Sequence, residues 1–361
     1  MISSITKKRF ASFMRIKRAW WSLIAFIGIF VFCLLADFVC PYDPSRITPA
    51  QELKDCLRDV VSCEYDIKTV RYSMTPSGEI FDVEGPLEEA NEDDYTITRT
   101  KRDGYVRVFM EPQNPPAVVE RKIGKERVSF PFRPCKGHWL GLDAAGRDVY
   151  SRIVHALRIA LLFSMALALS GILLGLVIGA VEGYFGGRTD IVCQRLTEIW
   201  SAMPFIYVMT FIGSTVGRSF TVLFVCYGIF NWIAVSYYMR AEFLRLRTRQ
   251  FVEAARVQGF GTLHIIFREI LPNALTPLIT LFPFLLLGAV ASLSALDFLG
   301  FGLPPMTPSC GEMLYQGQQH PEAWWLVVFP ALALFVVMML AVLIGEGLRD
   351  AFDPRQRSRI E

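Results

Sequence analysis

Several patterns that carry chemistry are missing from this sequence. It has no Gly-x4-Gly-Lys-Ser/Thr segment, whose backbone amides cradle nucleotide phosphates, and no His-Glu-x-x-His or paired Cys-x-x-Cys. The histidines are few and far apart along the chain: His138, His155, His264 and His320. We therefore expect no ATPase site, no metal centre, no catalytic constellation and no cofactor bound by this chain.

A strong charge imbalance is also missing. The formal net charge is only +3 over 361 residues, and the basic residues gather in short segments, which is typical of membrane topology signals rather than a nucleic-acid footprint. Hydrophobic residues make up 53% of the chain and the mean hydropathy is +0.37, too apolar for an ordinary soluble domain. The composition predicts a membrane protein.

Long apolar runs predict an all-α membrane protein with six spans. A basic tail, 1–18, precedes the first span at 19–39, and a core domain, 151–350, follows an insertion and ends in a second tail, 351–361. The five core spans are expected at about 157–181, 196–216, 219–239, 273–296 and 325–344. Short basic loops stay in the cytoplasm, so we expect both termini there.

The span interiors have no Asp, Glu, Lys, Arg or His. Such a residue costs about 2.5–3.5 kcal/mol at the centre of a membrane helix and is usually retained for ion or proton transport. Its absence argues against a proton-coupled carrier or a charged-ring channel. Energy for any transport must then come from a partner.

The insertion between the first two spans, 40–150, is polar and charged. The alternation from Tyr95 to Arg99, a turn at Asp103-Gly104, and a second alternation from Tyr105 predict a β-hairpin within a mixed, partly β segment. Cys56 and Cys63 are close in sequence and are the candidate disulfide of this segment, with unpaired thiols as the alternative.

Four glycines recur every fourth residue in the second expected span: Gly171, Gly175, Gly179 and Gly183. Such a ridge lets another membrane helix approach closely, although glycine is also simply common in membrane helices. We favour helix packing at this ridge.

The loop 240–272 between the fourth and fifth spans has its own order. Phe251, Ala255 and Gln258 fall on one helical face, and Gly259 is placed to end that helix in a left-handed cap. Apolar residues at i, i+3, i+4 and i+7 indicate a second amphipathic helix: Leu263, Ile266, Phe267 and Ile270. Pro272 is expected to break or kink this helix. The pattern predicts a helix-turn-helix on the inner membrane face, which could also be a hairpin resting on lipid.

Motifs in four regions resemble the permeases of ABC importers. Glu253-Ala254-Ala255, Gly259 and Leu271-Pro272 match the EAA loop of that superfamily in type and spacing. The segment from Gly141 to Arg152 resembles a signature of dipeptide and oligopeptide permeases, with Leu142 where Thr is usual. The stretches from Leu296 to Leu314 and from Gly345 to Arg355 look like C-type subunits of peptide importers, most like the E subunit of the Yej-type branch, which carries microcin C and peptides.

The resemblance implies a type I importer fold in the bacterial cytoplasmic membrane and import of peptides or peptide-like compounds. The EAA-like loop would dock on separate ATPase subunits that use ATP. Implied partners are a sister permease in a heterodimer, two ATPase domains or subunits, an extracytoplasmic solute-binding protein and membrane lipid, with no nucleic acid. The alternative function is a membrane-anchored scaffold or receptor whose insertion binds a partner.

Overall fold

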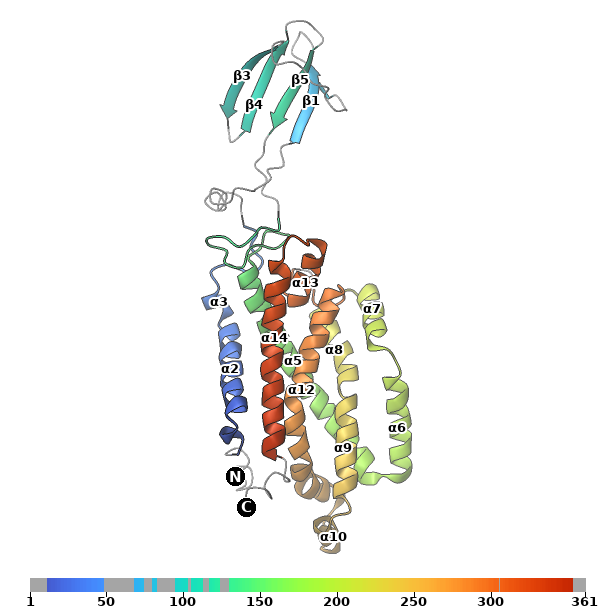
Figure 1. The fold of residues 1–361 in the computed structure, drawn as a ribbon. Helices are drawn as coiled ribbons and strands as arrows, with labels where there is room; N and C mark the ends of the chain where they lie inside the picture. Colours follow the sequence, from blue (N-terminus) through green and yellow to red (C-terminus); the bar gives the residue numbers. More distant parts are fainter. Residues whose placement is uncertain are drawn as a thin grey trace. The chain divides into compact units, whose positions relative to one another are not determined.

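The computed structural model describes residues 12–48, 68–74, 80–82, 95–102, 105–112, 117–123, 130–304 and 306–352. The chain divides into two compact units. One, the membrane unit, combines Met1–Arg46 with Arg147–Glu361, and the other, the inserted unit, is Ile47–Gly146 (Figure 1). Each unit is described by itself below.

Five helical stretches among the described residues are long and apolar enough to cross a membrane. These are α2 (Lys17–Leu34), α5 (Val149–Phe185), the pair α8 and α9 (Phe220–Asn231, Ile233–Leu246), the run of α11, η2 and α12 (Thr262–His264, Ile265–Ile270, Leu271–Phe298), and α14 (Trp325–Phe352). The bent pair α6 and α7 (Gly187–Ser201, Phe205–Thr215) makes six if it counts as one span. The membrane unit also contains the short helices α3 (Ala36–Val39), α10 (Gln250–Val257) and α13 (Cys310–Gln319).

The span expected at 196–216 is not one straight helix. Its two halves meet at an angle of 64°, with Pro204 just before α7. Proline has no amide to donate and disfavours helical geometry in the preceding residue, so the helix ends at Ser201 and restarts at Phe205.

The span expected at 157–181 is also longer than its apolar run. α5 begins at Val149 because the Asp148 side chain accepts a hydrogen bond from the Ser151 amide, 2.8 Å away, and caps the helix. At its other end α5 continues to Phe185 and so includes Glu182, which is buried. Glu182 therefore lies in α5 just beyond the expected span, because a helix continues past its apolar stretch until a cap ends it.

Helix α5 is central to the packing of the membrane unit. It packs against α8, α9 and α12, while α14 packs against α2 and α12 (Figure 1). A core cluster joins Phe163 and Leu167 of α5 to Leu223 of α8 and Leu293 of α12. The first span is held to the last at one end, where Ala19 contacts Gly347 and Arg18 forms an ion pair with Asp350.

The inserted unit contains five described strands in two sheets. β1 (Lys68–Met74) pairs antiparallel with both β2 (Ile80–Asp82) and β5 (Ala117–Ile123). β3 (Tyr95–Arg102) pairs antiparallel with β4 (Tyr105–Pro112), and Arg102 lies opposite Tyr105. The structure thus pairs the two segments for which the sequence predicts a hairpin.

Candidate functional site

The first helix of loop 240–272 is α10, which is amphipathic. Its buried residues are Val252 and Ala255, which pack with Phe243 and Leu246 of α9 and with Ile265 and Ile270 of η2. Glu253, Ala254 and Phe251 are exposed. Phe251 and Gln258, which the sequence places on one helical face with Ala255, are exposed, and Val252 packs into the core beside Ala255.

Gly259 ends α10 in the left-handed conformation, with φ +80°. Its amide donates to the Arg256 carbonyl and the Phe260 amide donates to the Ala255 carbonyl, at 3.0 and 3.1 Å. This pair of bonds is the Schellman arrangement, which satisfies the last carbonyls of a helix and favours glycine at this position. The predicted left-handed cap is present, and it turns the chain sharply into α11.

The second helix of the loop differs from its prediction in two ways. Ile265 and Ile270 are buried, whereas Leu263 and Phe267 are 70% and 63% exposed, so the expected apolar stripe is not the packed face. Pro272 neither breaks nor ends the helix, which runs from Thr262 to Phe298. The π-helical turn η2, in which the Leu271 amide donates to the Ile266 carbonyl, precedes Pro272 and lets the helix continue through it.

Two arginines tie this loop to the neighbouring helices. The Arg240 guanidinium makes two hydrogen bonds to the Asp190 carboxylate of α6, Nε–Oδ1 at 2.5 Å and Nη2–Oδ2 at 2.7 Å. Arg247, which follows α9, donates from Nη1 to the Tyr184 carbonyl at the end of α5, 3.3 Å away. These hydrogen bonds join the loop to α5 and α6.

The four glycines of α5 all face the α8–α9 region. An added Cβ would meet Asn231 Nδ2 at 2.6 Å from Gly171 and Val235 Cβ at 2.6 Å from Gly175. From Gly179 it would meet the Ser236 carbonyl at 2.5 Å, and from Gly183 the Phe243 Cβ at 2.5 Å. The ridge thus brings the α9 backbone within a distance that no larger residue permits.

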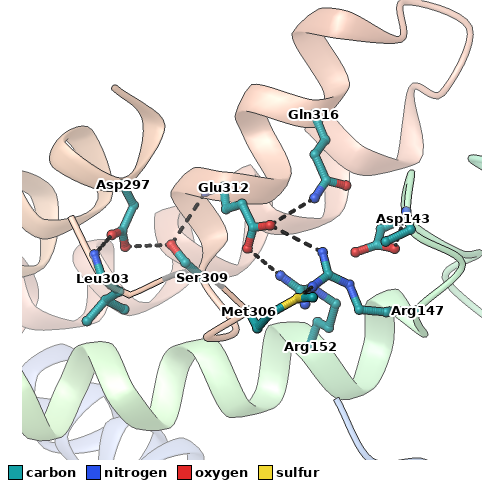
Figure 2. Close-up of polar contacts among 10 residues, drawn as sticks. Asp143, Arg147, Arg152, Asp297, Leu303, Met306, Ser309, Glu312 and Gln316 are labelled. Atoms are coloured by element: carbon teal, nitrogen blue, oxygen red, sulfur yellow. Dashed lines mark hydrogen bonds and ion pairs between the residues drawn. The ribbon is translucent and has the colours of Figure 1, made fainter. Parts of the chain in front are cut away.

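A polar network joins α5, α12 and α13 at the opposite end of α5. Glu312 of α13 accepts hydrogen bonds from Arg147 at 3.2 Å, Arg152 at 2.5 Å and Gln316 at 3.1 Å (Figure 2). We call Arg147, Arg152, Glu312 and Gln316 the carboxylate clamp. Both arginines are almost fully buried, so the clamp fixes α13 on the first turns of α5.

A second carboxylate, Asp297, extends this network to the end of α12. It accepts hydrogen bonds from the Ser309 hydroxyl at 2.5 Å and the Leu303 amide at 2.6 Å, and Ser309 caps α13 (Figure 2). The two motif regions Gly141–Arg152 and Leu296–Leu314 therefore meet in space through Arg147 and Arg152. Sequence reasoning identified both motifs but did not pair them, because an ion pair between distant segments leaves no regular spacing along the chain.

Cysteine and metal chemistry have little support in the described part of the chain. Cys56 and Cys63 lie outside the described residues, so their disulfide stays a prediction. Cys310 is a free, buried thiol, and burial raises its pKa to about 12, which leaves it unreactive. No group of three His, Cys, Asp or Glu side chains among the described residues could hold a metal ion.

These features define a class of protein: a multi-span membrane protein with a rigid helical hairpin at one end of its bundle and an ion-paired helix, α13, at the other. The chain belongs to the binding-protein-dependent transport system inner membrane component family, whose pattern matches residues 171–358. The N-terminal transmembrane domain of oligopeptide transport permease C matches residues 4–55.

Two curated relatives match nearly the whole chain, and a third matches part of it. The peptidoglycan transport system permease protein YejE of Agrobacterium fabrum is 34% identical over 99% of this chain and 95% of its own length. The inner membrane ABC transporter permease protein YejE of Escherichia coli is 32% identical over 98% of both chains. The oligopeptide permease OppC of Haemophilus influenzae is 35% identical over 61% of this chain and 71% of its own.

A solved inward-facing chain of the MetNI methionine ABC transporter overlays 55% of this chain and 95% of its own, with a TM-score of 0.47 and 17% identity. The family and the curated relatives make this chain a permease subunit of a peptide ABC importer. The alternative of a scaffold or receptor gives way to transport.

Proposed function

We propose that the chain imports peptides or peptide-like compounds as one half of a permease heterodimer, driven by two separate ATPase domains or subunits. An extracytoplasmic solute-binding protein would deliver the substrate. The names of two relatives support this class, since one is a peptidoglycan transport system permease protein and the other an oligopeptide transport system permease protein. ATP would be used by the partner ATPases and not by this chain.

The ATPase contact would be the loop 240–272, with Glu253, Ala254 and Ala255 in its first helix. The observation that carries this proposal is an exposed apolar surface on a hairpin whose other face is packed. Val257 is 89% exposed, Leu263 70% and Phe267 63%. A docked partner would bury these three large apolar side chains. Ala255, Gly259, Leu271 and Pro272 would act by shaping the hairpin.

The proposed coupling is a rigid-body motion. Nucleotide-driven closure of the ATPases would push the hairpin, and Arg240 and Arg247 would carry the displacement to α6 and α5. The glycine ridge would keep α5 and α9 together during that motion, so the spans would tilt as a group between inward and outward access.

Substitutions on the exposed face test the contact. Val257→Glu should leave the chain inserted but remove ATPase co-purification and uptake, because the charge would have to be buried in the docked complex. Gln250→Glu, which adds the same charge at the exposed start of α10, is the matched control and should retain both. Glu253→Arg should behave like Val257→Glu. Normal uptake and normal co-purification in both test variants would refute this docking surface.

The proposed orientation places both termini and the loop in the cytoplasm and the inserted unit outside. Reporter tags after Glu361 and within 246–250 should report a cytoplasmic location, and a tag near Asn91 the opposite compartment. Asn91 and Glu361 on the same side would overturn the orientation while leaving the ATPase docking test untouched.

A further inference from the structure

A buried carboxyl group near the hairpin end of α5 has no hydrogen-bond partner. Glu182 is 1% exposed, and neither of its carboxyl oxygens makes a hydrogen bond. The Ser236 hydroxyl of α9, in a fully buried residue, also makes none. The hydroxyl of the buried Thr197 of α6 donates a hydrogen bond to the Cys193 carbonyl, 2.9 Å away. Ser236 and Thr197 are polar neighbours of Glu182 at the junction of α5, α6 and α9.

The charged groups that act on Glu182 do not neutralise it. They are Arg240 of α9, which attracts a negative charge there, and Asp190 of α6, which repels it. Arg240 directs Nε and Nη2 to Asp190 rather than to Glu182. The Cys193 thiol of α6 is the other titratable group that interacts with it. The cation that acts on Glu182 is thus already paired with another carboxylate.

An ionised carboxylate accepts hydrogen bonds but cannot donate one, and burying it without a cation is costly. A neutral carboxylic acid avoids that cost and gains an O–H donor. The Ser236 hydroxyl oxygen is an acceptor with no other partner at the same junction. A single proton on the Glu182 carboxyl would therefore give both groups a partner, because the carboxyl could then donate a hydrogen bond to the Ser236 hydroxyl.

We propose that Glu182 is a proton-binding site, and that its neutral carboxyl donates a hydrogen bond to the Ser236 hydroxyl and so joins α5 to α9. The site lies beside Gly183, where α5 presses on the Arg240 backbone at the start of the hairpin loop. The bound proton would hold α5 to α9 at this junction. The proposal concerns the chain itself and does not depend on what docks on the hairpin.

Infrared spectroscopy of the full chain in lipid nanodiscs at neutral pH tests the site, because protonated and ionised carboxyl groups absorb in separate regions. We expect Glu182→Gln to remove one carboxylic-acid carbonyl band. Glu198→Gln, which changes an exposed glutamate paired with Arg195, should remove none and is the matched control.

A second variant keeps the test decisive if Glu182→Gln folds poorly. Ser236→Ala removes the proposed acceptor but keeps the proton, so the same band should remain and move to higher frequency. If neither variant alters the acid carbonyl region, Glu182 is ionised and the proposal is wrong. The neutral, isosteric Glu182→Gln should also keep the unfolding temperature of the wild-type chain, and a large drop would show that the charge is needed.

Discussion

Asp37, in α3 just beyond the first span, shows how one side chain can hold two helices together. Its carboxylate accepts a hydrogen bond from Arg158 at 2.7 Å and lies 3.1 Å from His155 Nε2, both on α5. The hydrogen bond from Arg158, followed by that from His155, holds the pKa of Asp37 below its usual value. Because the pKa of Asp37 is lowered in the folded state, its ion pair stabilises the fold at pH values above the unfolded pKa. This stabilisation is lost as the pH falls through the folded pKa.

Asp37→Asn should therefore loosen α3 from α5 at neutral pH as acid does in the wild type. The adjacent Cys40 thiol, whose pKa is raised by burial, provides the measurement. Alkylation of Cys40, followed by peptide mass spectrometry, should be faster in Asp37→Asn than in wild type at neutral pH and should lose that difference in acid. Asp43→Asn, which changes a nearby carboxylate that accepts hydrogen bonds from Ser45 in its own turn, should leave the rate unchanged. Equal rates at every pH would contradict the role of Asp37.

Gly259 and Gly261 separate backbone strain from crowding, because an added Cβ would meet nothing within 4 Å at either position. Gly259 has φ +80°, while Gly261 has φ −69°. Alanine at Gly259 should cost about 1–2 kcal/mol of hairpin stability, since the left-handed conformation is unfavourable for a residue with a Cβ. Hydrogen exchange at the Gln258 to Phe260 amides should rise in Gly259→Ala and stay unchanged in Gly261→Ala. The same exchange in both variants would show that the cap does not hold the hairpin.

At the scale of elements, the glycine ridge makes a prediction about helix packing. Leucine at Gly175 or Gly179 would collide with the α9 backbone and should destabilise the membrane unit by at least about 1–3 kcal/mol. Gly228→Ala on α8 is the control, because its Cβ would meet nothing within 4 Å and alanine is the better helix former. Thermal unfolding in detergent should fall for the ridge variants alone. A ridge variant as stable as the control would mean that α5 and α9 pack differently.

The carboxylate clamp should respond to loss of its acceptor. Glu312→Gln removes the carboxylate that two buried arginines share, and breaking such buried pairs costs about 3–5 kcal/mol. Because Glu312 is 33% exposed, solvent screening should reduce this to about 1–3 kcal/mol. Glu322→Gln, at an exposed residue near His320, is the control. Limited proteolysis between Phe301 and Ser309 should accelerate in Glu312→Gln only, and unchanged cleavage would exclude the clamp as the tie on α13.

The same elements show how far sequence reasoning reaches. Hydropathy located every spanning helix and the glycine repeat singled out the face of α5 that meets α9, because both are signals within one helix. The loop residues were found but the buried face of α10 was not assigned, since Val252 and Phe251 differ by only one position and tertiary packing chooses between them. Glu182 was missed because the end of α5 is set by Gly186 and not by hydropathy. The clamp required two segments to meet, which no periodicity encodes.

At the scale of the whole molecule, the chain leaves the membrane unit and returns to it through residues that converge within the inserted unit. The Thr48 amide donates to the Gly146 carbonyl at 2.8 Å. A Cβ on Gly146 would meet the Phe130 ring at 2.9 Å, and the Leu142 amide donates to the Phe132 carbonyl at 2.8 Å. Thr48 and Phe130 therefore both adjoin Gly146, although many residues lie between them along the chain.

Because these points converge, residues 49–129 can be replaced by a short Gly/Ser linker without stretching the chain, and excisions at such converging sites are tolerated. We expect the shortened chain to insert in the membrane, to keep the unfolding temperature of the membrane unit, and to retain resistance to proteolysis between Phe301 and Ser309. An excision from 49 to 146 is the matched comparison and should insert less well and unfold at a lower temperature. It also removes the turn that precedes α5 in the chain, in which the Asp143 carboxylate accepts a hydrogen bond from the Ala145 amide. Failure of the 49–129 excision to insert would mean that the membrane unit needs the inserted strands to fold. Equal behaviour of the two excisions would show that the turn between Phe130 and Gly146 is not needed for insertion or stability.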